Sequence, residues 1–195
     1  MTSTSSTAIA EIGIGPVQVS AFANMAQLLS YIIRDDGSVY AGSAIAINPE
    51  KILTAMENPQ VLAVIEQADL RYADGIGVVK VMQQRLGRKV ERIPGCELWQ
   101  ALMARAAEYQ VPVYLVGAKP EVLAQTRTKL LQMGAKVVGA TDGYFKDEAQ
   151  LLQAIKDSGA RFVSVAMGSP KQELLIQRMR AVHPCLLYTS PSPRD

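Results

Sequence analysis

The sequence has few of the residues from which disulfide frameworks, zinc centres and nucleophilic triads are built. Its 195 residues include two cysteines, Cys96 and Cys185, and a single histidine, His183. The cysteines show neither paired nor metal-ligand spacing, which favours a reduced, cytoplasmic setting. One histidine next to a proline is more typical of a structural role than of a Ser/His or Cys/His nucleophile.

Long apolar runs and an excess of one charge are also absent. No apolar run approaches the roughly 20 residues that cross a bilayer. Residues 1–10 lack the basic start and the apolar core of a secretory signal, so they predict a short flexible lead. The 20 basic and 18 acidic residues give a formal charge of only +2, without the electrostatic footprint of a nucleic-acid-binding protein. The sequence contains no Asp-x-Asp motif that would hold a divalent ion against a nucleotide-sugar diphosphate, so we expect no metal site and no cofactor.

What the sequence does contain is a regular alternation of apolar, β-branched segments with segments of helical period. Strands are predicted at 43–47, 69–73, 111–116, 135–139 and 161–167. Helices are predicted at 49–57, 59–67, 76–85, 97–109, 120–133, 147–158 and 173–182. Asn48 and Asn58 are predicted N-caps, because each stands before a proline that suits the first helical position. The alternation predicts an α/β fold, Rossmann-like, with a mostly parallel sheet flanked by helices.

The predicted α/β core spans residues 15–184 and follows a flexible lead at residues 1–14. Residues 185–195 differ in character, because they end in Ser-Pro-Ser-Pro, which favours neither helix nor strand. A strand could begin at 186–188, but its pattern breaks off there. We therefore expect residues 185–195 to be a tail that is not native to the domain.

Small and polar residues follow the predicted strands at the ends where an open parallel sheet binds its ligands. The candidates for binding a substrate at this edge are Asn48, Gly117, Gly168, Ser169 and Gln172. The turn at 168–173 joins a buried strand to an amphipathic helix, so its backbone N–H groups could bind a phosphate or a sugar. Together these residues predict an enzyme that acts on a phosphate-bearing substrate.

Asp74 is the predicted catalytic base. A partly buried carboxylate between a strand and Gly75 could accept the proton of a hydroxyl group. The alternative is an N-cap for the helix that begins near Ile76. Arg92 precedes the rigid turn 93–95, and its guanidinium is predicted to hold a diphosphate by paired hydrogen bonds.

Ser169 and Gln172 have two compatible interpretations. Their spacing matches a capping box, in which both side chains bond to the first turn of a helix. A role toward a ligand remains compatible with capping, because one face of the first turn still points at the cleft. Asn48 carries the same two interpretations.

Six motifs in order resemble the WecG/TagA/CpsF family of glycosyltransferases, over residues from about 15 to 184. They are IAINPEK (45–51), YADGIGVV (72–79), RIPG (92–95), LVG (115–117), DGYF (142–145) and MGSPKQE (167–173). The Ile47-Asn48 form favours the WecG branch, because the teichoic-acid branch tends to carry Thr-x-Asn. The resemblance implies an inverting, metal-independent transfer of N-acetylmannosaminuronic acid from UDP, in the synthesis of enterobacterial common antigen.

The resemblance also implies roles for single residues. Asp74 matches the family's proposed base, which would deprotonate the 4-hydroxyl of the acceptor sugar. Asn48, Arg92 and Gln172 match positions of the family's pocket, and Gly168 and Ser169 would let the donor approach the helix start.

The expected partners are a UDP-sugar donor and an N-acetylglucosamine linked to undecaprenyl diphosphate, with no nucleic acid. The family's C-terminal segment, which is absent here, implies attachment to the inner face of the bacterial cytoplasmic membrane. Whether the chain forms a homo-oligomer stays open. Three alternatives stay open as well: an N-acetylmannosamine transferase of teichoic-acid type, a Rossmann-like nucleotide-binding oxidoreductase and a non-catalytic binding module. The oxidoreductase is disfavoured because Gly75-Ile76-Gly77 lacks the third glycine of the dinucleotide motif.

Overall fold

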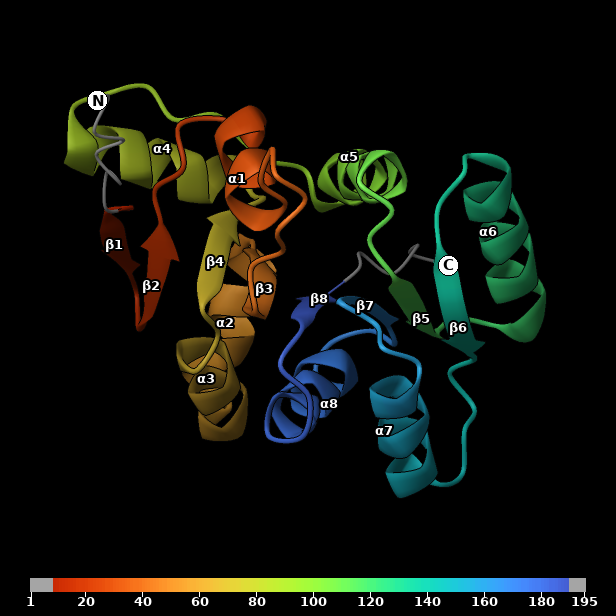
Figure 1. Ribbon diagram of the computed structural model, residues 1–195. Helices are drawn as coiled ribbons and strands as arrows, with labels where there is room; N and C mark the ends of the chain where they lie inside the picture. The colour runs from red at the N-terminus through yellow and green to blue at the C-terminus, as the bar shows by residue number, and fades with distance from the viewer. Residues whose placement is uncertain (1–8, 190–195) are drawn as a thin grey trace.

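The computed structural model describes residues 9–189 and has an α/β architecture built on a parallel sheet of six strands (Figure 1). The order across this sheet is β4-β3-β8-β7-β5-β6. Its strands are β3 (Gly42–Ile47), β4 (Leu70–Ala73), β5 (Val113–Gly117), β6 (Val137–Thr141), β7 (Phe162–Ala166) and β8 (Leu186–Thr189). A separate antiparallel hairpin is formed by β1 (Glu11–Ile14) and β2 (Val17–Ser20).

Helices cover both faces of the parallel sheet. They are α1 (Met25–Ile32), α2 (Pro49–Glu57), α3 (Pro59–Glu66), α4 (Ile76–Leu86), α5 (Gly95–Glu108), α6 (Pro120–Gln132), α7 (Glu148–Asp157) and α8 (Lys171–Arg180). Helices α1, α5 and α6 pack on one face, whereas α2, α3, α7 and α8 pack on the other (Figure 1). The predicted fold class is therefore confirmed.

The alternation of side chains along each strand divides the core between these two faces. In β7, Phe162 packs with α5 and α6, whereas Val163 and Val165 pack with α7 and α8. In β8, Tyr188 lies on the first face and Leu187 on the second. Because both faces are covered, the strands consist almost entirely of apolar residues, as is typical of parallel sheets.

Each predicted strand and helix is present, with ends that shift by a few residues. Asn48 and Asn58 are the N-caps of α2 and α3, because the Oδ1 atom of each accepts backbone N–H bonds. Sequence analysis did not anticipate α1 or the β1–β2 hairpin. No described helix is long and apolar enough to cross a membrane, since the longest, α5, has 14 residues.

The C-terminal boundary expected after Pro184 needs correction. Strand β8 lies in the interior of the sheet, where it pairs with β3 and with β7. Its side chains are buried on both faces, so residues 186–189 belong to the core. At the other end, residues 11–14 of the expected lead form β1. Residues 1–8 and 190–195 lie outside the described residues, and the origin of the tail stays a prediction.

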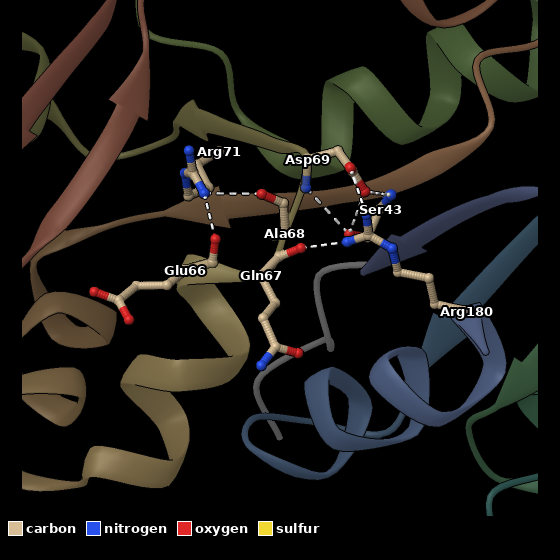
Figure 2. Close-up of polar contacts among 7 residues, drawn as sticks. All are labelled: Ser43, Glu66, Gln67, Ala68, Asp69, Arg71 and Arg180. Carbon is tan, nitrogen blue, oxygen red and sulfur yellow. Dashed lines mark hydrogen bonds and ion pairs between the residues drawn. The ribbon is translucent and has the colours of Figure 1, made fainter.

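The amino edge of the sheet, where the strands begin, carries a polar network (Figure 2). Asp69 Oδ1 pairs with Arg180 Nη2 at 2.7 Å, and its Oδ2 accepts from the backbone and the hydroxyl of Ser43 at 2.8 and 3.1 Å. Arg180 also donates to the carbonyl oxygen of Gln67. These bonds join α3, β3, β4 and the C-terminal end of α8.

Candidate active site

The carboxyl edge of the sheet brings the predicted site residues together from separate parts of the chain. Asn48 follows β3, Asp74 follows β4, Gly117 ends β5 and Gly168 follows β7. Because all these strands are parallel, their carboxyl ends meet at one edge. Arg92 lies on the loop that leads from α4 into α5 and reaches the same edge by contacting Asp74.

Arg92 holds Asp74 through two donors of its guanidinium. Its Nη2 lies 3.2 Å from Asp74 Oδ1, and its Nε donates to the carbonyl oxygen of the same residue. The Asp74 side chain is 20% exposed and that of Arg92 is 47% exposed, so both remain open to solvent. Within residues 9–189, no hydrogen bond reaches Asp74 Oδ2. One carboxylate oxygen is therefore fixed and the other is available.

The alternative of Asp74 as an N-cap is wrong. Helix α4 has Gly75 at its N-cap position and no side-chain cap bond. The carboxylate turns instead toward Arg92, which lies 18 positions away in the chain. Its orientation is thus set by a tertiary contact and not by the local helix start.

Asn48 and Asp74 lie on loops that touch. The backbone N–H of Asp74 donates to the carbonyl of Ile47 at 2.9 Å. A Cβ at Gly75 would lie only 2.5 Å from Pro49 Cδ, so this approach requires glycine. Contact between these two neighbouring loops therefore explains why glycine follows Asp74 in the motif. Asn48 Oδ1 caps α2 through the N–H of Lys51 at 2.8 Å.

Gln172 is buried at the start of α8 and does not form the predicted capping box. Its Oε1 accepts from the N–H of Met167 at 3.3 Å, while its Nε2 donates to Glu173 Oε1 at 3.4 Å. Pro170 is the N-cap of α8, and no side-chain cap bond occurs there. Ser169 is exposed on the turn, so the cap explanation for Ser169 and Gln172 is wrong.

Lys51 and Glu173 form an ion pair beside these residues that the sequence did not predict. Lys51 Nζ lies 2.7 Å from Glu173 Oε1, and the two side chains are 11% and 1% exposed. The pair joins α2 to α8 and so connects the two helix starts that carry Asn48 and Gln172. Both residues belong to the quoted motifs, but nothing in their spacing indicates that they pair across 122 positions.

Gly117 and Gly168 both adopt left-handed backbone angles at this edge. A Cβ at Gly117 would lie 2.2 Å from the carbonyl oxygen of Ala166, so β5 and β7 approach closely here. Gly168, with φ of +75°, has no atom within 4 Å of an ideal Cβ position. Position 168 therefore requires glycine because of its backbone conformation alone. Position 117 requires glycine both for its backbone conformation and because a Cβ atom would clash with Ala166.

A pocket of about 200 Å³ opens beside Gly117, between α5 and α6. It is mainly apolar, and its lining includes Cys96, Trp99 and Ser164. The indole N–H of Trp99 donates to Ser164 Oγ at 2.9 Å, so this ring is fixed and not merely packed in the core.

Two buried tyrosines support the start of α5. The Tyr72 and Tyr188 hydroxyl oxygens lie 2.8 Å apart, and Tyr188 donates to the carbonyl of Gly95 at 3.0 Å. Burial raises the pKa of both hydroxyls above their ordinary value of 10.0. The pair stays neutral near pH 7 and ties β4 and β8 to the helix that follows Arg92. The alternation in β4 could have indicated that Tyr72 is buried, whereas Tyr188 lay in the presumed tail.

Helices α4, α5, α6 and α8 begin at the carboxyl edge with no side-chain cap bond among the described residues. Their first N–H groups therefore have no side-chain acceptor and carry the positive end of the helix dipole. Over residues 9–189, no three His, Cys, Asp or Glu side chains come together as a metal site requires. The edge thus offers the Asp74 carboxylate, the Arg92 guanidinium and several backbone donors.

A protein-family model described as the glycosyl transferase WecG/TagA/CpsF family matches residues 12–188. The matched region contains the whole parallel sheet except the last residue of β8. It also contains each of the site residues described above.

Proposed function

The chain belongs to the WecG/TagA/CpsF family of glycosyltransferases, and on this basis we propose that it transfers N-acetylmannosaminuronic acid from UDP to N-acetylglucosaminyl-diphospho-undecaprenol. Family membership assigns glycosyl transfer in the synthesis of a cell-envelope polysaccharide, with a sugar donor and a lipid-linked acceptor. The particular sugar, the enterobacterial common antigen pathway and work at the inner face of the cytoplasmic membrane belong to the proposal.

The observation that supports this proposal best is the position of Asp74. One carboxylate oxygen is held by Arg92, while the other is unbonded among the described residues and lies at an edge that is open to solvent. We assign this carboxylate the role of general base. It accepts the proton of the acceptor hydroxyl as that oxygen attacks C1 of the donor sugar. The bond from C1 to the diphosphate oxygen breaks, its electron pair leaves with UDP, and attack from the opposite side inverts the configuration.

The leaving diphosphate carries charge that needs stabilisation without a metal ion. Arg92 has five N–H donors in its planar group, of which two bond to Asp74. The remaining donors are suited to phosphate oxygens, as are the uncapped starts of α5 and α8. Asn48, Gly117, Gly168, Ser169 and Gln172 lie at or just after the carboxyl ends of β3, β5 and β7 and are proposed to contact the donor.

Ligand titration tests the proposed function. Purified chain is titrated with UDP and, separately, with NAD, and binding is measured by calorimetry. We expect UDP to bind and NAD to give no heat, because a transferase must hold the leaving nucleotide. NAD binding without a UDP response would favour the oxidoreductase. Transfer is then assayed with lipid-linked acceptor and either UDP-N-acetylmannosaminuronic acid or UDP-N-acetylmannosamine, and preference for the second donor would favour the teichoic-acid type of activity.

A further inference from the structure

A buried ion pair lies beside the candidate site and has no role in the proposed reaction. It consists of Lys51 on α2 and Glu173 on α8, with 2.7 Å between Nζ and Oε1. The carboxylate is 1% exposed, and its second oxygen, Oε2, is buried with no partner among the described residues. Both charged groups have thus lost most of their contact with water.

The pair connects Asn48 and Gln172, the two nearby residues that are proposed to contact the donor, through hydrogen bonds and the side chain of Lys51. Asn48 Oδ1 accepts from the backbone N–H of Lys51, whose ammonium group binds Glu173 Oε1. The same carboxylate oxygen accepts from Nε2 of Gln172. The amide of Gln172 is therefore oriented from one side by Glu173 and from the other by the N–H of Met167.

Stability alone does not explain why charges are buried at this position. Moving both charges out of water costs free energy that their attraction repays only in part, and apolar pairs of similar volume are often as stable. The unpartnered Oε2 adds to that cost. An apolar pair would also join α2 to α8, but it would supply no acceptor to fix the Gln172 amide.

We propose that Lys51 and Glu173 are positioning residues that fix the Gln172 amide and the start of α2 for binding of the nucleoside diphosphate part of the donor. This inference rests on the proposed function. The ammonium of Lys51 is committed to Glu173 and does not bind the phosphates itself. Its contribution is to hold the carboxylate in place, so that Gln172 and Asn48 face the donor in one arrangement.

The test replaces the ion pair with apolar side chains and measures UDP affinity and stability separately. In the double variant Lys51→Met/Glu173→Leu, we expect the free energy of unfolding to be maintained or raised. UDP should bind about tenfold more weakly, the size of effect that losing one oriented hydrogen bond produces. The conservative variant Lys51→Arg keeps a cation on Glu173 and should bind UDP nearly as well as the parent.

The matched control is the ion pair at the other end of the same helix. Arg180 and Asp69 are also 2.7 Å apart, but they lie at the amino edge (Figure 2). Asp69→Asn should lower stability and leave the UDP dissociation constant of the folded protein unchanged. If the apolar double variant bound UDP as tightly as the parent, Lys51 and Glu173 would be structural only. A parent chain without affinity for UDP would instead refute the proposed function and, with it, the role of this pair.

A coupling measurement adds a readout that a purely structural pair would not change. Gln172→Ala is made both in the parent and in the apolar double variant, and UDP affinity is measured for all four proteins. We expect the substitution to weaken binding in the parent and to have little further effect once the ion pair is gone. Equal losses in both backgrounds would show that the ion pair does not act through Gln172.

Discussion

Helix α8 carries an ion pair near each of its ends, and the two surroundings differ in how completely the protein satisfies its own polar groups. At the amino edge, both carboxylate oxygens of Asp69 are bonded, to Arg180 and to Ser43 (Figure 2). At the carboxyl edge, Glu173 keeps one oxygen without a partner among the described residues. Asp74 at the same edge also has one carboxylate oxygen, Oδ2, that accepts no hydrogen bond from residues 9–189.

The helix starts extend the same contrast. Helices α4, α5, α6 and α8 begin without a side-chain cap, whereas α2 and α7 are capped by Asn48 and Asp147. At the amino edge, Arg71 donates to the carbonyl oxygens of Glu66 and Ala68, and Arg180 donates to that of Gln67. The exception at the amino edge is Arg71 Nε, which is buried without a partner in the described chain. A protein that bonds its polar groups internally stabilises its fold there, and one that leaves donors and acceptors open can offer them to a ligand. The comparison therefore supports the proposal that the ligand binds at the carboxyl edge.

The largest expected effect comes from Asp74→Asn. The amide keeps an oxygen for Arg92 but cannot accept a proton, so we expect transfer to fall by about 10³-fold. UDP affinity and the free energy of unfolding should change little, because shape and the Arg92 contact are preserved. Single-turnover transfer, calorimetry and urea unfolding measure the three quantities. Asp69→Asn is the control, because it makes the same substitution at a carboxylate of the amino edge. An Asp74→Asn protein with full activity would exclude the base role.

Arg92→Lys is expected to have the next largest effect. Lysine carries the charge but lacks the planar guanidinium, so it cannot bond to Oδ1 and the backbone carbonyl oxygen of Asp74 and to a phosphate together. We expect transfer to fall by about 100-fold, as for removal of a donor that stabilises transition-state charge. Arg88→Lys is the control, because Arg88 donates to the carbonyl of Ala21 and not to Asp74. Equal activities of the two lysine variants would contradict the role given to Arg92.

A substitution at the amino edge should lower the free energy of unfolding and leave the transfer rate unchanged. Asp69→Asn leaves only one acceptor where the carboxylate has two, so either Arg180 or Ser43 loses its bond. We expect the free energy of unfolding to fall by about 2 kcal/mol, the typical cost of a lost hydrogen bond to a charged group. The transfer rate of the folded enzyme should match that of the parent. A clear loss of rate at temperatures where the variant is fully folded would break the contrast between the two edges.

The smallest effect is expected for the tyrosine pair. Tyr188→Phe removes the bond to Gly95 and should lower the free energy of unfolding by about 1 kcal/mol. Because burial raises the pKa of both hydroxyls above 10.0, the folded state holds protons that the unfolded chain releases. Their stabilisation is complete below pH 10 and declines as the pH rises further. Urea titrations across this range should show a shallower decline for the double variant Tyr72→Phe/Tyr188→Phe, and an unchanged slope would contradict the burial of these hydroxyls.

Much of the fold follows from local pattern. The apolar runs at 43–47 and 161–167 predict strands because β-branched residues suit a sheet that is covered on both faces. Asn48 before Pro49 predicts a helix start, since a capping amide and a fixed φ angle are local properties. Parallel order then places the predicted residues Asp74, Gly117 and Gly168 at one edge.

Other features depend on partners that are distant in the sequence. Strand β8 is short and is followed by prolines, so its local pattern is weak, yet it lies between two strands that supply its hydrogen bonds. The capping-box spacing of Ser169 and Gln172 predicted a local bond, but Gln172 is instead oriented by Met167 and Glu173. In each case tertiary contacts overrode a local preference that is worth little free energy.

By itself, then, the sequence determined the alternation of strands and helices, the caps of α2 and α3, and the family motifs, because each depends on residues within a few positions of one another. Only the tertiary structure decided that Asp74 faces Arg92, that Lys51 pairs with Glu173 and that Tyr188 supports α5. The physical reason is that charge pairing and burial are set by distance in space. Residues that are 122 positions apart can lie within 2.7 Å once the chain has folded.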